Sequence, residues 1–478
     1  MRLSELAYET ISPDPQIDGL TADSRAVSRG FLFAALEGVK SDGADFIPQA
    51  EENGAAAILA RPGVRSTLPV IEDPEPRRRL AQMAARFYPR QPEVVAGITG
   101  TNGKTSTARF AAQLWTLLGY EAGSMGTLGA QSRVYERPLA HTTPEPVTLH
   151  ETLDAMARAG VTHLAMEASS HALAQHRPDA VNFRVAAFTN ITQDHLDYHA
   201  SFDDYFAAKG RLFSQLLTTS GTAAINMDGE GAQGVVEIAR ARNLPTIQTG
   251  VKGRDVKLLS CKPHLGGLAL EIECNGYVYR ADPPLIGAFQ AENALLAAGI
   301  VIAAGAKPYD VMLQLDNLEG APGRMEYITE VWGGGVYVDY AHTPDAVATA
   351  LAAIRAHAPG KVIAIIGAGG DRDRTKRPLM GEAAAKYADT VIVADDNPRT
   401  EDPAAIRAEL MKGCPDAKNI GDRAEAIATG VAMLSEGDVL LILGKGHEAG
   451  QQVGDEIFPF DDASVARDAA SDRMKELG

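Results

Sequence analysis

The segment Ile98–Thr105 reads ITGTNGKT, and the rest of the chain is interpreted outward from it. The apolar run Val94–Thr99 predicts a buried strand that leads into this segment, and Thr105–Leu118 has a helical pattern. Glycines let the backbone N–H groups of such a loop turn toward phosphate oxygens, and a helix N-terminus adds partial positive charge. Lys104 would neutralise the β- and γ-phosphates, and the Thr105 hydroxyl would bind Mg²⁺. The sequence therefore predicts a nucleotide-binding loop.

This loop departs from the strict pattern G-x-x-x-x-G-K-[ST]. The first glycine of that pattern would fall at Ile98, whereas the glycine stands one residue earlier, at Gly97. A loose match of this kind also occurs in unrelated loops. The prediction of nucleotide binding therefore depends on the context of strand, loop and helix.

Strands and helices alternate along the chain, which predicts an α/β fold with parallel, doubly wound sheets. Helical patterns separate most of the apolar runs that predict strands. These runs are Gly54–Ala60, Val161–Met166, Arg184–Thr189, Thr222–Asn226, Val336–Asp339, Lys361–Ile366, Thr390–Ala394 and Asp438–Leu443.

Two segments rich in proline or glycine mark expected domain boundaries. Prolines recur through residues 74–92, and Gly320–Gly323 reads GAPG. We expect three α/β domains: residues 1–92, a central P-loop ATPase-like domain with a mainly parallel sheet at 93–322, and a C-terminal Rossmann-like domain at 323–478. In such sheets, ligands bind at the loops that follow the strands.

Composition narrows the class of protein. The net charge of −17 argues against general nucleic-acid binding, which needs a basic surface. The three cysteines form no CxxC pair and no disulfide framework. The N-terminus lacks an apolar signal segment, and the longest apolar run, Ala294–Ala306, is shorter than a membrane span. We therefore expect a cytoplasmic protein without membrane insertion.

Three side chains outside the loop are candidates for metal or substrate binding. Glu167 follows a predicted strand, where a carboxylate can hold Mg²⁺ or, alternatively, cap a helix or form a salt bridge. His195 follows another strand, with Asp194 or Asp197 placed to orient it, although a lone histidine is more often structural. Lys209 lies in a helical pattern, where a solvated lysine is the ordinary interpretation.

Ten motifs in order make the chain similar to the Mur ligase family over essentially its whole length. They are GTNGKT (Gly100–Thr105), HTTPEP (His141–Pro146), EASSHAL (Glu167–Leu173), DHLDYH (Asp194–His199), YFAAK (Tyr205–Lys209), PGRME (Pro322–Glu326), DYAHTPDA (Asp339–Ala346), GAGGDRD (Gly367–Asp373), DNPRTEDP (Asp396–Pro403) and GKGHE (Gly444–Glu448).

The resemblance implies a reaction. ATP phosphorylates the D-glutamyl γ-carboxylate of UDP-N-acetylmuramoyl-L-alanyl-D-glutamate, and an amine then attacks the acyl phosphate to give an amide, ADP and phosphate. Such chemistry requires neutralisation of developing negative charge, which Mg²⁺ and Lys104 can supply. The resemblance also implies UDP-sugar binding by the first domain. We expect the protein to be a monomer.

Site residues follow from the resemblance motif by motif. Lys104, Glu167, His195 and Lys209 are the implied catalytic residues; Thr105, Glu167, His195 and a carbamylated Lys209 are the implied magnesium ligands. The implied nucleotide contacts are Gly100, Thr101, Asn102, Gly103, Lys104, Thr105, Ser106, Asn293, Arg324, Asp339 and His342. The implied UDP-sugar and peptide contacts are Ala22, Ser24, Thr142, Thr143, Ser169, Gln175 and Arg177. Gln290 stands where the family usually has asparagine.

The segment Asp396-Asn397-Pro398-Arg399 indicates which amino acid is added. Meso-diaminopimelate differs from lysine by a second carboxylate, and an arginine suits that group because its planar fork donates two charge-assisted hydrogen bonds. Lysine-adding relatives typically lack this arginine. Arg372, Gly444 and Glu448 match the other implied diaminopimelate contacts, with Glu448 placed to hold an ammonium group.

Three other functions compete with this interpretation. A lysine-adding ligase and a folylpolyglutamate synthase would share the ATP machinery. The DNPR segment argues against both, and the first-domain segment Asp23-Ser24-Arg25 also argues against the synthase. A non-catalytic sensor of nucleotide or UDP-sugar belongs to a different class. It is disfavoured because Lys104, Glu167, His195 and Lys209 are all present.

Overall fold

The structure is a computed structural model, and it describes residues 1–38, 41–192, 198–264 and 266–475. By its internal contacts the chain divides into two compact units. The first unit comprises Met1–Lys257 with Leu295–Val311, and the second comprises Leu258–Ala294 with Met312–Gly478. Each unit is described by itself.

The N-terminal part of the first unit is built on a parallel four-stranded sheet in the order β1-β2-β3-β4. Leucine, isoleucine and alanine side chains of these strands pack with helices α1 and α3. Gly54, with φ +91°, ends the turn after α2. The predicted strand at Gly54–Ala60 therefore begins later, at Ala57. The elements are α1 Leu3–Ala7, β1 Gly19–Thr21, β2 Phe31–Ala34, α2 Ile47–Glu52, β3 Ala57–Ala60, β4 Val70–Glu72 and α3 Pro76–Phe87.

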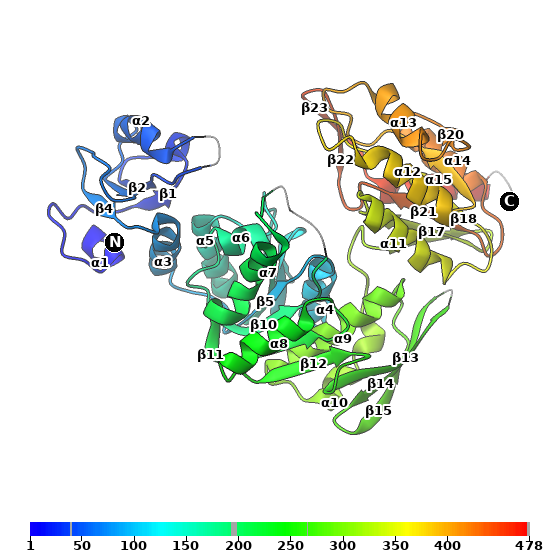
Figure 1. Ribbon diagram of the computed structural model, residues 1–478, viewed down its shortest axis with the longest axis horizontal. Coiled ribbons are helices and arrows are strands. Elements are labelled where there is room, and N and C mark those ends of the chain that lie inside the picture. Colours follow the sequence, from blue (N-terminus) through cyan, green and yellow to red (C-terminus); the bar gives the residue numbers. More distant parts are fainter. Residues whose placement is uncertain (39–40, 193–197, 265, 476–478) are drawn as a thin grey trace. The chain divides into compact units, whose positions relative to one another are not determined.

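The central sheet has the order β15-β14-β13-β12-β11-β10-β5-β9-β6-β7-β8. Its middle strands are parallel, and β5 lies between β9 and β10. Figure 1 shows β5 and β10 side by side. The elements before residue 200 are β5 Val94–Thr99, α4 Lys104–Leu117, β6 Ala122–Gly126, β7 Gly129–Ser132, β8 Glu136–Arg137, α5 Pro146–Arg158, β9 His163–Glu167, α6 Ser170–Ala174 and β10 Phe183–Phe188. Those after it are α7 Phe202–Arg211, β11 Leu217–Asn226, α8 Ala232–Ala241, β12 Thr246–Gly250, β13 Val256–His264, β14 Gly267–Cys274, β15 Tyr277–Ala281, α9 Ala288–Ala303 and α10 Pro308–Met312.

The second unit contains a six-stranded sheet in the order β16-β17-β21-β18-β19-β20, parallel except for β16. Apolar clusters fill both faces of this sheet. A separate hairpin, β22–β23, follows β21. The elements are β16 Glu326–Val331, β17 Gly334–Asp339, α11 Pro344–Arg355, β18 Val362–Ile366, α12 Lys376–Tyr387, β19 Thr390–Val393, α13 Pro403–Met411, β20 Lys418–Asn419, α14 Arg423–Ala432, β21 Val439–Leu443, β22 Gly450–Val453, β23 Glu456–Pro459 and α15 Asp462–Lys475.

The predicted α/β class with mainly parallel sheets is confirmed, and β5 has the predicted bounds. The predicted helix after the loop is α4, shifted by one residue. The domain boundaries near residues 92 and 322 stay a prediction. Among the described residues, no helix combines the length and the apolar character needed to cross a membrane.

Candidate active site

The loop between β5 and α4 depends on two glycines. Gly100 has φ +149°, and a Cβ there would collide with Thr189 Oγ1 at the end of the neighbouring strand β10. Gly103, with φ +84°, precedes α4, so the loop enters the helix through a left-handed residue. The loop N–H groups and the helix N-terminus therefore stand at the carboxyl end of the sheet, where phosphate oxygens are bound in such folds.

Residues after β10 hold the loop in place. The Thr101 N–H donates to Asn190 O (2.9 Å), and the Asn102 N–H donates to Asn190 Oδ1 (3.0 Å). The Thr189 hydroxyl donates to Asn102 O (2.6 Å). The backbone of the loop is thus fixed by its neighbour strand, and phosphate binding would cost little reorganisation.

Two lysines converge on one carbonyl oxygen of the loop. Lys104 Nζ donates to Gly100 O at 3.0 Å and to Thr101 O at 2.8 Å. Lys209 Nζ donates to Gly100 O at 2.7 Å and lies 4.3 Å from the centre of the Tyr205 ring. Lys209 is only 2% exposed on helix α7, so the interpretation as a solvated helix lysine is wrong.

Glu167 is the last residue of β9 and pairs in register with Ile98 of β5. It is 2% exposed, and its Oε1 accepts from the Thr105 hydroxyl (3.0 Å) and the Thr127 N–H (2.8 Å). Gly126 makes room for the carboxylate, because a Cβ there would collide with Glu167 Oε1. The parallel pairing of β5 with β9 therefore brings two predicted magnesium ligands, Thr105 and Glu167, together.

These residues fit a magnesium ion. Carboxylate and hydroxyl oxygens are the donors that Mg²⁺ prefers, and the ion usually takes one or two carboxylates together with substrate phosphates. Within the described ranges, no cluster of three His, Cys, Asp or Glu side chains could hold a metal unaided. Such a site would need phosphate oxygens to complete its coordination. The candidate His195, with Asp194 and Asp197, lies outside the described residues.

The predicted peptide-binding residues form one network beside Glu167. The Thr143 hydroxyl donates to Glu167 O (2.9 Å) and accepts from the Ser169 N–H (3.1 Å), and Thr142 Oγ1 lies 3.1 Å from Thr127 Oγ1. Arg177 Nη1 donates to Thr143 O (3.0 Å), and its Nη2 donates to Gln175 Oε1 (2.7 Å). Thr143 thus links the Glu167 backbone to Ser169 and Arg177.

The N-terminal candidates follow strand β1. Ala22 is exposed after Thr21, whereas Ser24 is buried. The Ser24 hydroxyl donates to Gln49 Oε1 (2.7 Å), and its carbonyl accepts from Asn53 Nδ2 (3.0 Å). The segment is therefore held by helix α2 and the turn after it.

The remaining nucleotide candidates lie in the second unit. Asn293 Nδ2 donates to Gln290 Oε1 (3.0 Å), and Gln290 Nε2 lies 3.5 Å from Arg324 O, so Gln290 links two candidates. Asp339 accepts from the N–H groups of Met325 (2.7 Å) and Ala341 (2.8 Å). Burial raises the pKa of Asp339, and the positive charge of Arg324 opposes that rise.

Arg324 and His342 both lie close to the Tyr340 ring. The Arg324 guanidinium carbon stands 4.5 Å from the centre of the Tyr340 ring. Its Nε is buried with no hydrogen-bond partner among the described residues. His342 is exposed, and its Nδ1 lies 2.9 Å from Tyr340 O. A buried, unpaired guanidinium N–H is a donor available to an anionic ligand.

The predicted diaminopimelate residues gather where β19 and β21 end. Asn397 Nδ2 donates to Glu448 Oε2 at 2.8 Å. A Cβ on Gly444 would stand 2.5 Å from Asp396 Oδ2, so this glycine permits the close approach of the two loops. Pro398 is buried between Asn397 and Arg399. The DNPR segment and the GKGHE segment are therefore in direct contact.

Arg399 has a left-handed backbone, with φ +52°. Its N–H donates to Gln452 O (3.1 Å), and its carbonyl accepts from the Gly454 N–H (2.7 Å), so the β22–β23 hairpin holds this conformation. Its Nη1 donates to Gly370 O (2.8 Å). A non-glycine residue in this region is strained by about 1–2 kcal/mol, and such strain persists where surrounding contacts over-determine the backbone.

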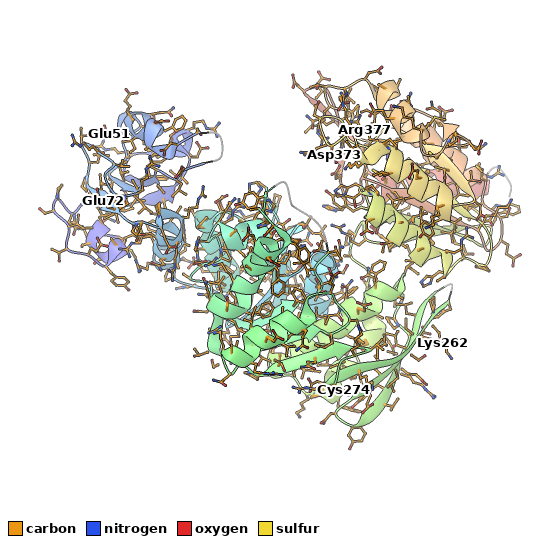
Figure 2. The ribbon with its side chains drawn as sticks, in the orientation of Figure 1. Glu51, Glu72, Lys262, Cys274, Asp373 and Arg377 are labelled. Carbon is orange, nitrogen blue, oxygen red and sulfur yellow. The ribbon has the colours of Figure 1, made fainter. Side chains whose placement is uncertain are left out.

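A buried arginine ties the Arg399 loop to the loop after β18. Arg377 Nη2 donates to Glu401 Oε1 (2.9 Å) and to Gly369 O (3.2 Å). The Arg377 guanidinium holds the pKa of Glu401 at about 2. Figure 2 shows Arg377 and Asp373 close together in the second unit, at the start of α12. Arg372, the remaining candidate, is exposed on this same loop.

Comparison with known proteins decides the family. Models described as "Mur ligase family, catalytic domain", "Mur ligase middle domain" and "Mur ligase, glutamate ligase domain" match residues 16–88, 98–301 and 323–446. A UDP-N-acetylmuramoyl-L-alanyl-D-glutamate–2,6-diaminopimelate ligase from Caulobacter vibrioides is 49% identical and covers 97% of each chain. The chain belongs to the Mur ligase family.

This Mur ligase is also similar to other known proteins and solved structures. The enzyme of the same name from Brucella melitensis is 44% identical, covering 100% of this chain and 99% of its own. A solved structure of such a ligase has a TM-score of 0.75 at 31% identity, covering 99% of both chains. MurF from Thermotoga maritima in complex with ADP, at 19% identity, shares the fold with a TM-score of 0.59 over 96% of this chain and 98% of its own.

The structure adds to the candidate site of this Mur ligase a residue that the sequence did not indicate. Thr127 binds Glu167 through both its N–H and its hydroxyl (2.8 and 3.4 Å). Its only sequence signal is its place after strand β6, which the apolar pattern did not mark. Gln290, noted from sequence as a departure, is 1% exposed and joins Asn293 to the backbone of Arg324.

Proposed function

We propose that this Mur ligase joins meso-diaminopimelate to UDP-N-acetylmuramoyl-L-alanyl-D-glutamate, using ATP, in the synthesis of a peptidoglycan precursor. The observation that carries the proposal is the pairing of Asn397 with Glu448 (2.8 Å) beside Arg399, whose guanidinium is oriented by Gly370 O. The relatives above that are 44–49% identical carry this activity in their names.

The phosphate loop would bind and orient ATP. Its N–H groups and the start of α4 face the carboxyl end of the sheet, and Lys104 Nζ already lies against the loop carbonyls at 2.8–3.0 Å. Rotation of this flexible side chain onto the β- and γ-phosphates would neutralise charge as the phosphoryl group moves to the D-glutamyl carboxylate. The resulting acyl phosphate reacts with the amine to release phosphate and form the amide.

Magnesium would be held by Thr105 and Glu167, with His195 as a further candidate. When bound, the ion would neutralise phosphate charge. The Thr127 N–H and the two hydroxyl groups keep the Glu167 carboxylate oriented for this role.

Carbamylation of Lys209, which the family resemblance implies, fits the charge of this site. The ammonium groups of Lys104 and Lys209 each lie within 3.0 Å of Gly100 O, so they would repel each other. A carbamate on Lys209 replaces one cation by an anion beside Lys104 and adds oxygen donors for Mg²⁺. Carbamylation can be tested by measuring the intact mass of gently prepared protein before and after acid treatment. Loss of the carbamate would lower the mass by about 44 Da, the mass of carbon dioxide.

The amino-acid end of the site selects diaminopimelate by charge. Arg399 can donate two parallel hydrogen bonds to the distal carboxylate, and Glu448 can accept an ammonium. Lysine would place an ammonium near the Arg399 guanidinium and would be repelled. Arg324, with its unpaired buried Nε, supplies a donor for the nucleotide.

One experiment tests the function directly. The protein is incubated with UDP-N-acetylmuramoyl-L-alanyl-D-glutamate, ATP, Mg²⁺ and either meso-diaminopimelate or L-lysine, and the products are weighed by mass spectrometry. We expect an amide product with diaminopimelate and ADP released in equal amount. Equal activity with lysine would refute the specificity, and absence of amide product with both would favour a non-catalytic sensor.

Since ATP and UDP-linked precursors are cytoplasmic metabolites, we place the reaction in the cytoplasm.

A further inference from the structure

Lys445 is a fully buried lysine that no step of the proposed reaction uses. It follows strand β21 in the GKGHE segment, and its side chain has 0% exposure. An ionised amine in the interior is costly unless its three protons find acceptors. The acceptors around the Lys445 ammonium therefore indicate its role.

Three acceptors surround the Lys445 ammonium. Nζ lies 2.5 Å from Gly450 O, 3.3 Å from Asn397 Oδ1 and 3.4 Å from Glu448 Oε2. Gly450 begins the β22–β23 hairpin, and the other two acceptors are the pair assigned to the amino-acid substrate. A single ammonium thus joins the hairpin to both substrate-binding side chains.

This contact fixes which way the Asn397 amide faces. Its Oδ1 accepts from Lys445 Nζ and from the Gln452 N–H (2.9 Å), so Nδ2 must point toward Glu448. A flipped amide would set its NH₂ group against both donors. Lys445 and the Gln452 N–H together therefore ensure that the Asn397 side presented to Glu448 is a hydrogen-bond donor.

The same contact orients the Glu448 carboxylate. Oε2 accepts from Asn397 Nδ2 and lies beside Lys445 Nζ, while the side chain as a whole is 37% exposed. Because Oε2 is engaged, a ligand's ammonium would be accepted by Oε1. A carboxylate held in one rotamer binds an ammonium without first losing conformational freedom.

We propose that Lys445 is a positioning residue for the amino-acid substrate: its buried ammonium orients Asn397 and Glu448 so that they can receive the zwitterionic end of a diamino acid. This inference rests on the proposed function. Lys445 does not touch the substrate itself, because its side chain has no exposed surface.

The test compares Lys445→Met with wild-type enzyme in steady-state assays. Methionine has a similar length and no charge. We expect the KM for meso-diaminopimelate to rise about tenfold or more, with the KM values for ATP and the UDP-linked substrate within about twofold of wild type. Lys412→Met, at an exposed lysine of the same unit, is the matched control and should leave all three values unchanged.

A double-mutant cycle with Glu448→Gln separates positioning from a general loss of structure. If Lys445 acts through Glu448, the double variant should have nearly the KM of Glu448→Gln alone, about tenfold below the product of the two single effects. Independent effects that multiply would overturn the proposal, as would an unchanged diaminopimelate KM or an equal rise in the KM for ATP.

Lys445→Gln, which keeps a donor for Gly450 O, is the second variant if Lys445→Met does not fold. Failure of both variants to fold would also overturn a role confined to positioning. Failure of the wild-type enzyme to form any diaminopimelate product would instead refute the proposed function, so the two failures are distinguishable.

Discussion

Replacement of Arg399 by methionine should weaken diaminopimelate binding without disturbing the fold. Methionine has a Cβ like arginine, so the strain at φ +52° is unchanged, and the backbone hydrogen bonds to Gln452 and Gly454 that hold this conformation do not involve the side chain. The folded state loses the hydrogen bond from Nη1 to Gly370 O, which contributes about 1 kcal/mol. We therefore expect a small fall in melting temperature.

The effect on binding is larger because Arg399 would form a charge-assisted pair with the distal carboxylate of diaminopimelate. Loss of a charge-assisted pair costs about 2–5 kcal/mol at buried sites, and the lower end applies at partial exposure. A cost of about 2 kcal/mol raises the dissociation constant about 30-fold. The KM for ATP should not change, since Arg399 is not among the candidate nucleotide residues.

The assay measures phosphate release against diaminopimelate concentration for wild type, Arg399→Met and Arg280→Met. Arg280 is 84% exposed on β15 and serves as the control. The preference for diaminopimelate over lysine, as a ratio of kcat/KM values, should fall with Arg399→Met by a similar factor. A diaminopimelate KM within about twofold of wild type would remove Arg399 from the substrate pocket.

Three further predictions concern the first unit. Lys104→Met should lower kcat by at least about a hundredfold at unchanged melting temperature, because it removes phosphate neutralisation; ATP turnover like that of wild type would contradict the role. Gly126→Ala should raise the Mg²⁺ concentration needed for half-maximal activity, since its Cβ collides with the Glu167 carboxylate; Gly320→Ala, with open space around it, is the control, and an unchanged Mg²⁺ requirement would argue against a metal at Glu167. Burial lowers the pKa of His150 to about 4, so its neutral form stabilises the fold above about pH 6.5, and this stability is lost as the pH falls toward 4. His150→Gln should therefore show a smaller drop in melting temperature than wild type between pH 7 and pH 4.5, whereas an identical drop would show that His150 does not titrate in this range.

Local sequence patterns were sufficient for much of the fold and for one part of the site. Apolar runs placed β5 with its observed bounds and β9 to within two residues at each end. The glycines of the loop and the position of Glu167 at a strand end followed from the same patterns. Such features depend on residues close together in the chain, where periodicity and backbone preference act directly.

Local sequence patterns did not predict which charged side chains are buried. Lys209 lies in a helical pattern typical of a solvated lysine, but its Nζ meets Gly100 O, which is 109 residues away in the chain. Spacing along a helix gives the direction in which a side chain points, and it does not say what packs over that face. Thr127 was missed for the same reason, because its partner Glu167 lies 40 residues further along.

The sequence by itself determined the alternation of strands and helices, the phosphate loop and the order of motifs that places the chain among the Mur ligases. Only the tertiary structure decided which side chains share a carbonyl, which amide face Asn397 presents, and which lysines are buried. The physical reason is that helix, strand and turn preferences are set by neighbours in the chain. Desolvation and hydrogen-bond pairing of a charge are instead set by residues that meet only when the sheets assemble.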